Sequence, residues 1–294
     1  MRSGPSANTI REVDFVSCTP DLFRAELKKR GVIILRGAIS KRRIAATKAK
    51  VEAAIQKLST VTEESINEWN WQQWWPGNSM SFSIGKARGG EINDAMVRDA
   101  TDDSLSFYDL ISAPPFHRLL ARGFPGLDFR STPVAHCRKM SPKIGGIKLH
   151  CDIRYHRDGP FALNFWTPLD PAGEKFGTSG LEIWPIGYAA VRKYLQHNGV
   201  SPKDMRDDLI EAVPQVFGPP VRTNIDAGDV MVFTSWTLHR TYFPDSDCAD
   251  RTSVEVRLAA DQWPDDPLAR LPSAWRGRPA RALSRLLSAS GLAG

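Results

Sequence analysis

The sequence is poor in cysteine and contains no long apolar run. Its four cysteines are scattered without any CxxC pair, at Cys18, Cys137, Cys151 and Cys248. This spacing argues against a disulfide framework or a cysteine-based zinc site and indicates reduced thiols. The longest aliphatic stretch, residues 31–35, has the length of a strand and not of a membrane span. No apolar segment follows the first charged residues, so we expect a cytoplasmic protein without a signal peptide or a membrane partner.

Basic residues are concentrated at the two ends of the chain. The formal net charge is +6, yet residues 1–50 carry +8, residues 267–294 carry +5, and the middle carries −7. The middle, which holds the candidate motifs described below, is therefore acidic. No basic stripe interleaved with aromatic residues occurs, so we expect no nucleic-acid partner and interpret the charged ends as solvated surface.

The length and the pattern of apolar and turn-forming residues predict one domain over residues 1–294, mostly β with flanking helices (α+β). We expect a mainly helical annex and lid at residues 1–131, a barrel core at 132–262 and a basic C-terminal tail at 263–294. Within the core, short β-rich runs alternate with Gly, Pro and Asp, which favours a jelly-roll or cupin-like double-stranded β-helix over βαβ units. The predicted strands are residues 134–140, 146–152, 161–168, 180–185, 221–225, 229–235 and 252–260.

Helical patterns surround this core. Residues 20–30 read as a short helix closed by Gly31, and residues 31–35 as a buried strand. Ser40 is a plausible N-cap for a helix that runs to about Leu58. Further helical spacing occurs in residues 91–121, which we expect to break at Pro114-Pro115, in the insertion at 189–213, and at 280–287. Four tryptophans between Trp69 and Trp75 could either line a binding pocket or seal the annex against the core.

The tripeptide His150-Cys151-Asp152 is the first candidate for chemistry. On a strand, an imidazole and a carboxylate two positions apart point to the same side. They would supply two of the three ligands of a 2-His-1-carboxylate site, which is typical of non-haem Fe(II) oxygenases. A second His-x-Asp, at His156 and Asp158, precedes Gly-Pro and reads as a turn, so we prefer the first pair.

His239 is the best candidate for a third ligand. It ends the apolar run that begins at Asp229, where we expect a strand to carry it to the mouth of the barrel. A lone histidine in such a place is more often a satisfied core residue. The preceding His-x-Asp and an arginine twelve positions later, Arg251, favour the metal-ligand interpretation here.

Arg251 shares a strand face with Ser253. A guanidinium aimed into a barrel requires an anion, and its fork matches the distal carboxylate of a 2-oxo diacid. Thr241 could add a hydroxyl hydrogen bond. The plainer interpretation of Arg251 is an exposed ion pair with Asp247 or Asp250, and Arg257 and Arg138 are the next candidates for the anion anchor.

In these blocks the chain resembles the phytanoyl-CoA dioxygenase-like family of Fe(II)/2-oxoglutarate oxygenases. The matching blocks are residues 31–40, 150–152, 161–170, 180–185, 227–239 and Arg251, in order and at compatible spacing. The resemblance implies that His150, Asp152 and His239 bind iron and that Arg251 with Thr241 holds 2-oxoglutarate. It also implies that Trp166 lies on the barrel wall near this cosubstrate.

We therefore expect a dioxygenase that uses Fe(II), 2-oxoglutarate and O₂ to oxidise, most simply to hydroxylate, a C–H bond of a small molecule. Asp152 occupies the position that a halogenase leaves for chloride, which favours oxygen transfer. A natural-product or amino-acid-derived substrate is the expectation, with a coenzyme A thioester less favoured. The alternatives are a cupin-type isomerase or epimerase that does not use 2-oxoglutarate, and a non-catalytic jelly-roll binding protein.

Overall fold

The structure is a computed structural model, and its described part covers most of the expected core. It describes residues 9–58, 91–93, 106–132, 135–143, 145–155, 161–199, 212–260 and 262. Several predicted features lie outside these residues: the Trp69–Trp75 cluster, most of the expected lid, the His156 and Asp158 pair, and the basic C-terminal tail with its short helix.

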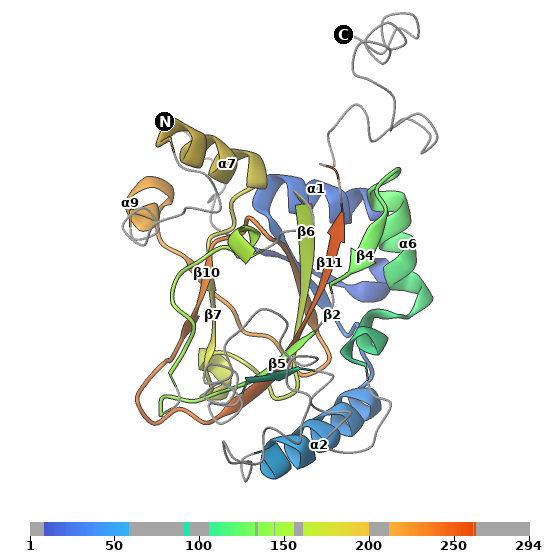
Figure 1. The fold of residues 1–294 in the computed structure, drawn as a ribbon, viewed down its shortest axis with the longest axis vertical. Coiled ribbons are helices and arrows are strands. Elements are labelled where there is room, and N and C mark those ends of the chain that lie inside the picture. Colours follow the sequence, from blue (N-terminus) through green and yellow to red (C-terminus); the bar gives the residue numbers. More distant parts are fainter. Residues whose placement is uncertain are drawn as a thin grey trace, which may run out of the picture.

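The main sheet runs through the middle of the molecule (Figure 1). Its strands follow the order β1-β2-β9-β6-β11-β5-β3, and β4 pairs with β11. All the pairs are antiparallel except β1 with β2. The bounds are Arg11–Asp14 (β1), Val32–Arg36 (β2), Glu91–Asn93 (β3), Phe129–Ser131 (β4), His136–Met140 (β5), Phe161–Pro168 (β6), Val230–Thr234 (β9) and Arg251–Ala260 (β11).

A second, smaller sheet lies to the left of β6 and β11 in Figure 1. It contains β10, β7 and β8 in that order, all antiparallel. Their bounds are His239–Tyr242, Gly180–Ile183 and Val221–Arg222. The described strands form two sheets that do not close into one barrel, so the double-stranded β-helix arrangement remains a prediction.

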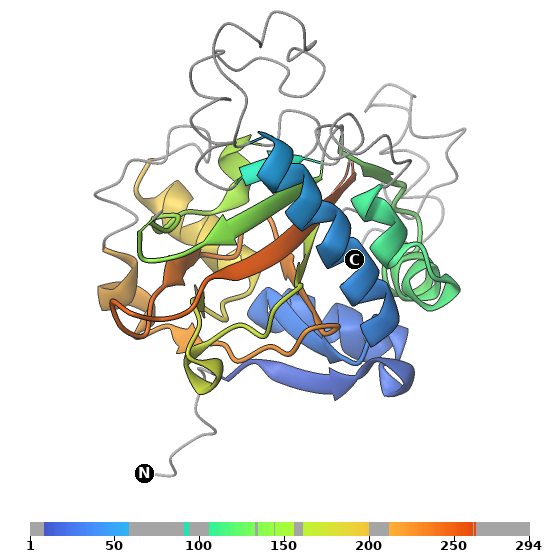
Figure 2. The same cartoon turned by 90° about the horizontal axis from the view of Figure 1, so that it is seen from below.

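Helices α1 and α6 lie on the side of the main sheet that is turned away from the small sheet, whereas α7 and α9 lie on the small-sheet side in Figure 1. Helix α6 lies on the outer side of the main sheet in both Figure 1 and Figure 2, and it contacts α1. The helices are α1 (Pro20–Arg30), α2 (Lys41–Leu58), α6 (Pro114–Gly123), α7 (Tyr188–His197) and α9 (Val213–Phe217), with 3₁₀ turns at Phe15–Ser17, Phe107–Ile111, Asp152–Tyr155 and Glu174–Phe176. No helix among the described residues is long and apolar enough to span a membrane.

The ends of α1 show why this helix forms where the sequence predicts it. The Thr19 hydroxyl accepts a hydrogen bond from the Leu22 amide at 3.2 Å, and Pro20 occupies the first helical position. Gly31 ends the helix with φ 73°, a left-handed conformation that glycine adopts without a Cβ penalty.

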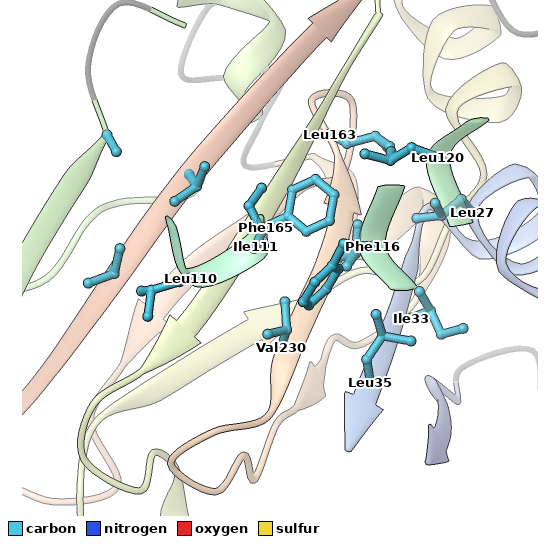
Figure 3. Packing of buried hydrophobic residues seen from close by; sticks show 14 of the residues in the cluster. Leu27, Ile33, Leu35, Leu110, Ile111, Phe116, Leu120, Leu163, Phe165 and Val230 are labelled. Carbon is cyan, nitrogen blue, oxygen red and sulfur yellow. The ribbon is translucent and has the colours of Figure 1, made fainter. Parts of the chain in front are cut away.

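The central strands β2, β6 and β9 of the main sheet are buried on both faces, and alternate residues belong to different cores. On β2, Ile33 and Leu35 join the core beneath the helices, where Phe116 of α6 meets Phe165 of β6 at 6.0 Å between ring centroids (Figure 3). Their neighbour Ile34 joins a smaller cluster that links the main sheet to the small sheet. The apolar run is nearly continuous because each face needs apolar side chains.

Most of the expected elements are present, with small shifts at their ends. The expected strand at residues 161–168 coincides with β6, and the helix predicted from Ser40 to Leu58 is α2. Three short strands were not predicted: β1, β4 and β10.

One prediction in the helical part was wrong: Glu91–Asn93 is a strand paired with β5 and not part of a helix. The expected break at Pro114-Pro115 is present, since the 3₁₀ turn Phe107–Ile111 ends just before the two prolines. Both prolines begin the next helix, α6, because proline is tolerated in the first turn, where its missing N–H has no intrahelical partner.

The candidate ligands also occupy different backbone contexts from those expected. Residues 146–149 are irregular, His150 makes an isolated bridge, and Asp152 begins a 3₁₀ turn instead of continuing a strand. His239 does not end a long strand: β9 stops at Thr234, the chain turns, and His239 is the first residue of β10 in the other sheet.

Candidate metal centre

His150, Asp152 and His239 meet at one buried point between the two sheets. One possible ligand atom from each lies within 4.8 Å of the others, and all three residues are buried. The Nε2 atom of His150 is 3.5 Å from Asp152 Oδ1, and the Nε2 atom of His239 is 3.7 Å from Asp152 Oδ2. Among the described residues no other group of histidine, cysteine and carboxylate side chains is arranged in this way.

Backbone pairing sets the spacing of the two histidines. The amide of His150 donates to the His239 carbonyl at 3.1 Å, and the amide of His239 donates back to the His150 carbonyl at 3.0 Å. A residue pair that exchanges both bonds is held directly opposite across an antiparallel bridge. The imidazole centroids are consequently 4.2 Å apart.

Each imidazole is oriented by the carbonyl two residues before it. His150 Nδ1 lies 2.7 Å from the Lys148 oxygen, and His239 Nδ1 lies 3.0 Å from the Thr237 oxygen. A carbonyl can only accept, so each Nδ1 carries a hydrogen, and each Nε2, which faces Asp152, is the nitrogen available to a metal. A backbone acceptor on the far nitrogen is the usual support of a metal-binding histidine.

The electrostatics keep the two kinds of ligand in their metal-binding forms. Burial, aided by the neighbouring His150, lowers the pKa of His239 to about 4, so its imidazole is neutral near pH 7. Burial, the largest single effect, raises the pKa of Asp152, but the charge of Arg257 and the contacts with His150 and His239 together outweigh burial and hold that pKa well below its ordinary value. A neutral histidine beside an ionised aspartate is the form that binds a divalent metal.

A narrow cavity extends from the histidines to Arg251. Its lining residues include His150, His239, Trp166, Thr241 and Arg251. The two candidate histidine ligands and the predicted anion anchor therefore line one cavity.

Arg251 is buried, with 2% of its surface exposed. Its guanidinium donates to the hydroxyls of Ser179 at 3.2 Å and Ser253 at 2.7 Å and lies 5.0 Å from the Trp166 ring centroid. Among the described residues no carboxylate forms an ion pair with it, so the exposed ion pair with Asp247 or Asp250 is not formed; Asp250 pairs with Lys139 instead.

The pKa of Arg251 shows the cost of this environment. Burial, together with the nearby charge of Arg138, lowers the pKa of Arg251 to about 10. The side chain stays protonated near pH 7, although no carboxylate of the described residues forms an ion pair with it. A bound anion would offset this cost, because it would neutralise the guanidinium charge without exposing the side chain to water.

Thr241 and Trp166 both line the cavity, although the Thr241 hydroxyl already has a partner. It accepts a hydrogen bond from the Ile147 amide at 3.2 Å. Its oxygen can still donate, since a hydroxyl has one hydrogen as well as two lone pairs. The ring of Trp166 forms the wall beside the Arg251 guanidinium.

The structure adds four polar residues that the sequence interpretation did not place at the centre. Asn164 and Arg257 contact Asp152, and Glu255 lies between Arg257 and Arg138. Arg257 and Arg138, considered as substitute anion anchors, are thus engaged with carboxylates of the chain. One signal could have found part of this set: Arg251, Ser253, Glu255 and Arg257 alternate with apolar residues and so share one strand face.

Comparison with known proteins finds relatives by structure only. No family model matches the sequence, and no curated protein matches it. AviO1 from Streptomyces viridochromogenes Tue57 superposes with a TM-score of 0.53 at 18% identity, over 83% of this chain and 96% of AviO1.

Two other similar structures come from nogalamycin biosynthesis. SnoK, a non-heme alpha-ketoglutarate-dependent carbocyclase, has a TM-score of 0.54 at 14% identity, over 89% of this chain and 94% of SnoK. SnoN, a non-heme alpha-ketoglutarate-dependent epimerase, has a TM-score of 0.50 at 15% identity, over 82% of this chain and 83% of SnoN. At such identities the likeness establishes the fold: this chain has the fold of non-heme enzymes that depend on alpha-ketoglutarate, which is 2-oxoglutarate.

Proposed function

We propose that this protein is an Fe(II)- and 2-oxoglutarate-dependent oxygenase that oxidises a C–H bond of a small molecule. One observation carries the proposal: the two histidines of a buried His-Asp-His cluster line the same cavity as a buried arginine that has no carboxylate partner among the described residues. The fold shared with SnoK and SnoN supports it.

The donor set suits a divalent iron ion. Two imidazoles and one carboxylate form the 2-His-1-carboxylate group that leaves coordination positions open on Fe(II). His150, Asp152 and His239 would hold the metal through two Nε2 atoms and a carboxylate oxygen. When bound together with 2-oxoglutarate, iron supplies O₂ activation: the cosubstrate becomes succinate and CO₂, and one oxygen atom is available to the substrate.

Arg251 is the group that would select 2-oxoglutarate. Its fork can hold the distal carboxylate of the cosubstrate, while the 2-oxo acid end turns toward the metal centre. Trp166 excludes water from one side of this arginine, and Thr241 offers a hydroxyl hydrogen. Excluding water strengthens the ion pair because the local dielectric constant is low.

The finer parts of the proposal concern family, product and substrate. The ordered sequence blocks support a place near the phytanoyl-CoA dioxygenase-like family, with residues 132–262 as the catalytic core of one domain acting in the cytoplasm. Asp152 favours oxygen transfer over halogenation, and hydroxylation is the simplest outcome. Because SnoK and SnoN are a carbocyclase and an epimerase, ring closure and epimerisation of a natural-product intermediate belong to the same class of outcome.

Release of succinate from 2-oxoglutarate tests this function without knowledge of the substrate. The purified protein should form succinate slowly with Fe(II), O₂ and 2-oxoglutarate, and faster when a screened metabolite is the substrate. His150→Ala should abolish the reaction, and His197→Ala, an exposed histidine on α7, should not change it. A protein that binds Fe(II) but never forms succinate would instead support a cupin-type metalloenzyme that does not use 2-oxoglutarate.

A further inference from the structure

Asn164 and Arg257 grip the carboxylate of Asp152 from two adjacent strands. We propose that this Asn164–Arg257 clamp positions Asp152 for metal binding and that Glu255 balances the charge of Arg257, an inference that rests on the proposed metal site. Asn164 and Arg257 are not candidate ligands. Both act through Asp152, so they are positioning residues.

The clamp is built by strand register. Asn164 on β6 and Arg257 on β11 are direct partners in the antiparallel ladder. Asn164 Nδ2 donates to Asp152 Oδ2 at 2.5 Å, and one terminal nitrogen of Arg257 donates to Asp152 Oδ1 at 3.2 Å. One donor therefore engages each carboxylate oxygen.

The remaining lone pairs of Asp152 face the histidines. The same Oδ1 atom lies 3.5 Å from His150 Nε2, and the same Oδ2 atom lies 3.7 Å from His239 Nε2. A carboxylate oxygen has two lone-pair sites, so it can accept from the clamp and still bind a metal. The clamp thus turns the carboxylate toward the point where the two Nε2 atoms converge.

Asp152 needs such support because it does not lie in a sheet. The two histidines are fixed by their backbone bridge, whereas Asp152 begins a 3₁₀ turn. Its side chain is buried, and it would retain torsional freedom if only the turn held it. Two donors from the middle of the main sheet supply the rigidity that a metal ligand requires.

The positive charge of Arg257 would repel a metal cation bound to Asp152, and Glu255 offsets this repulsion. Glu255 pairs with Arg257 and also with Arg138, at 3.0 Å. Together with Asp152 these side chains form a buried network of two cations and two anions, with no net charge. Arg257 can therefore orient Asp152 without presenting an unbalanced cation to a divalent metal.

The chain contains a matched control for this arrangement. On the small sheet, Glu182 pairs with Arg222 at 3.1 Å and with Arg240 at 2.5 Å, which forms a second Arg–Glu–Arg group away from Asp152. Removing Arg240 breaks an ion pair of the same kind, although Arg240 is more exposed, with 46% of its side chain accessible against 13% for Arg257.

Metal binding measured with Mn(II), by the decrease in the free-ion paramagnetic resonance signal, tests the clamp. Supporting groups around a metal ligand typically contribute about 10–100-fold to affinity, so Arg257→Met and Asn164→Leu should each weaken Mn(II) binding by that order. Arg240→Met should bind within about twofold of the wild type, and Arg257→Lys should recover part of the loss because its single ammonium can still reach Asp152. The charge-transfer absorption of the anaerobic Fe(II)–2-oxoglutarate complex should shift in Arg257→Met and stay unchanged in Arg240→Met.

The outcomes separate this inference from the proposed function. Wild-type affinity and an unshifted spectrum in both Arg257→Met and Asn164→Leu would overturn the clamp while leaving the metal site intact. A wild-type protein that binds neither Mn(II) nor Fe(II) would overturn the proposed function itself. If Arg257→Met does not fold, the comparison of Asn164→Leu and Arg257→Lys with Arg240→Met decides the question in the same way.

Discussion

His150 and His239 exchange two backbone hydrogen bonds, of 3.1 and 3.0 Å, although they are far apart in the sequence. This single bridge places both imidazoles on one side and directs both Nε2 atoms at Asp152. The candidate metal centre is therefore a product of the contact between a loop and the first residue of β10.

Removal of either histidine should abolish tight metal binding. His150→Ala and His239→Ala each delete one of three donors without disturbing the backbone bridge, so we expect Mn(II) or Fe(II) affinity to fall at least about 100-fold by the affinity effects typical of such sites. Isothermal titration under anaerobic conditions measures this. His156→Ala is the informative comparison: if it abolished binding while His150→Ala did not, the ligand assignment would be wrong.

Arg251 should control the affinity for 2-oxoglutarate more than the rate of turnover. Arg251→Lys removes the fork that matches a carboxylate, and Arg251→Met removes the charge as well. We expect the KM for 2-oxoglutarate to rise in both variants, and more in Arg251→Met than in Arg251→Lys. In Arg251→Met the loss of binding free energy should be about 2–4 kcal/mol, which is typical of a buried charge pair that loses one partner. Unchanged KM values in both variants would move the anchor to another residue.

The same arginine should reduce the stability of the ligand-free protein. A buried cation without a carboxylate partner among the described residues is costly, and apolar replacements of buried charges are often neutral or stabilising. We therefore expect Arg251→Met to unfold in denaturant at the wild-type midpoint or above it.

Saturating 2-oxoglutarate should raise the stability of the wild type, because the bound anion would pair with Arg251. With Fe(II) present it should stabilise the wild type by about 2.7 kcal/mol at 100 times its Kd and leave Arg251→Met unaffected. A large drop in the ligand-free stability of Arg251→Met would show that its hydrogen bonds to Ser179 and Ser253 outweigh the cost of burial.

Gly31 should be intolerant of a side chain for two separable reasons. Its φ of 73° costs an alanine about 1–2 kcal/mol, and an added Cβ would lie 2.6 Å from the Ile186 carbonyl oxygen and 2.8 Å from the Thr237 hydroxyl. Gly37→Ala is the matched control, because Gly37 has φ 65° and no atom within 4 Å of the added Cβ. Chemical denaturation should find Gly31→Ala clearly less stable than Gly37→Ala; equal losses would mean that the contact with Ile186 relaxes freely.

Local sequence signals were enough to predict several elements and the candidate ligands. Helix α1 is delimited by Thr19, Pro20 and Gly31, whose caps and backbone preferences act within a few residues. The strand β6 was predicted from its apolar run alone. His150, Asp152, His239 and Arg251 were found because their spacing and residue types match a known chemical pattern. The structure brings the first three together and places Arg251 in the cavity that both histidines line.

Only the tertiary structure decided how these residues are held. Asn164 faces Arg257 because β6 and β11 pair in one register, and a one-residue slip of either strand would send that strand's side chain to the helical face. The sequence also left Arg251, Arg257 and Arg138 as alternative anion anchors. Burial and long-range pairing distinguish them: Arg257 and Arg138 face carboxylates of the chain, whereas Arg251 is left with hydroxyls and an aromatic ring. Register and burial arise from contacts between distant segments, so no local pattern encodes them.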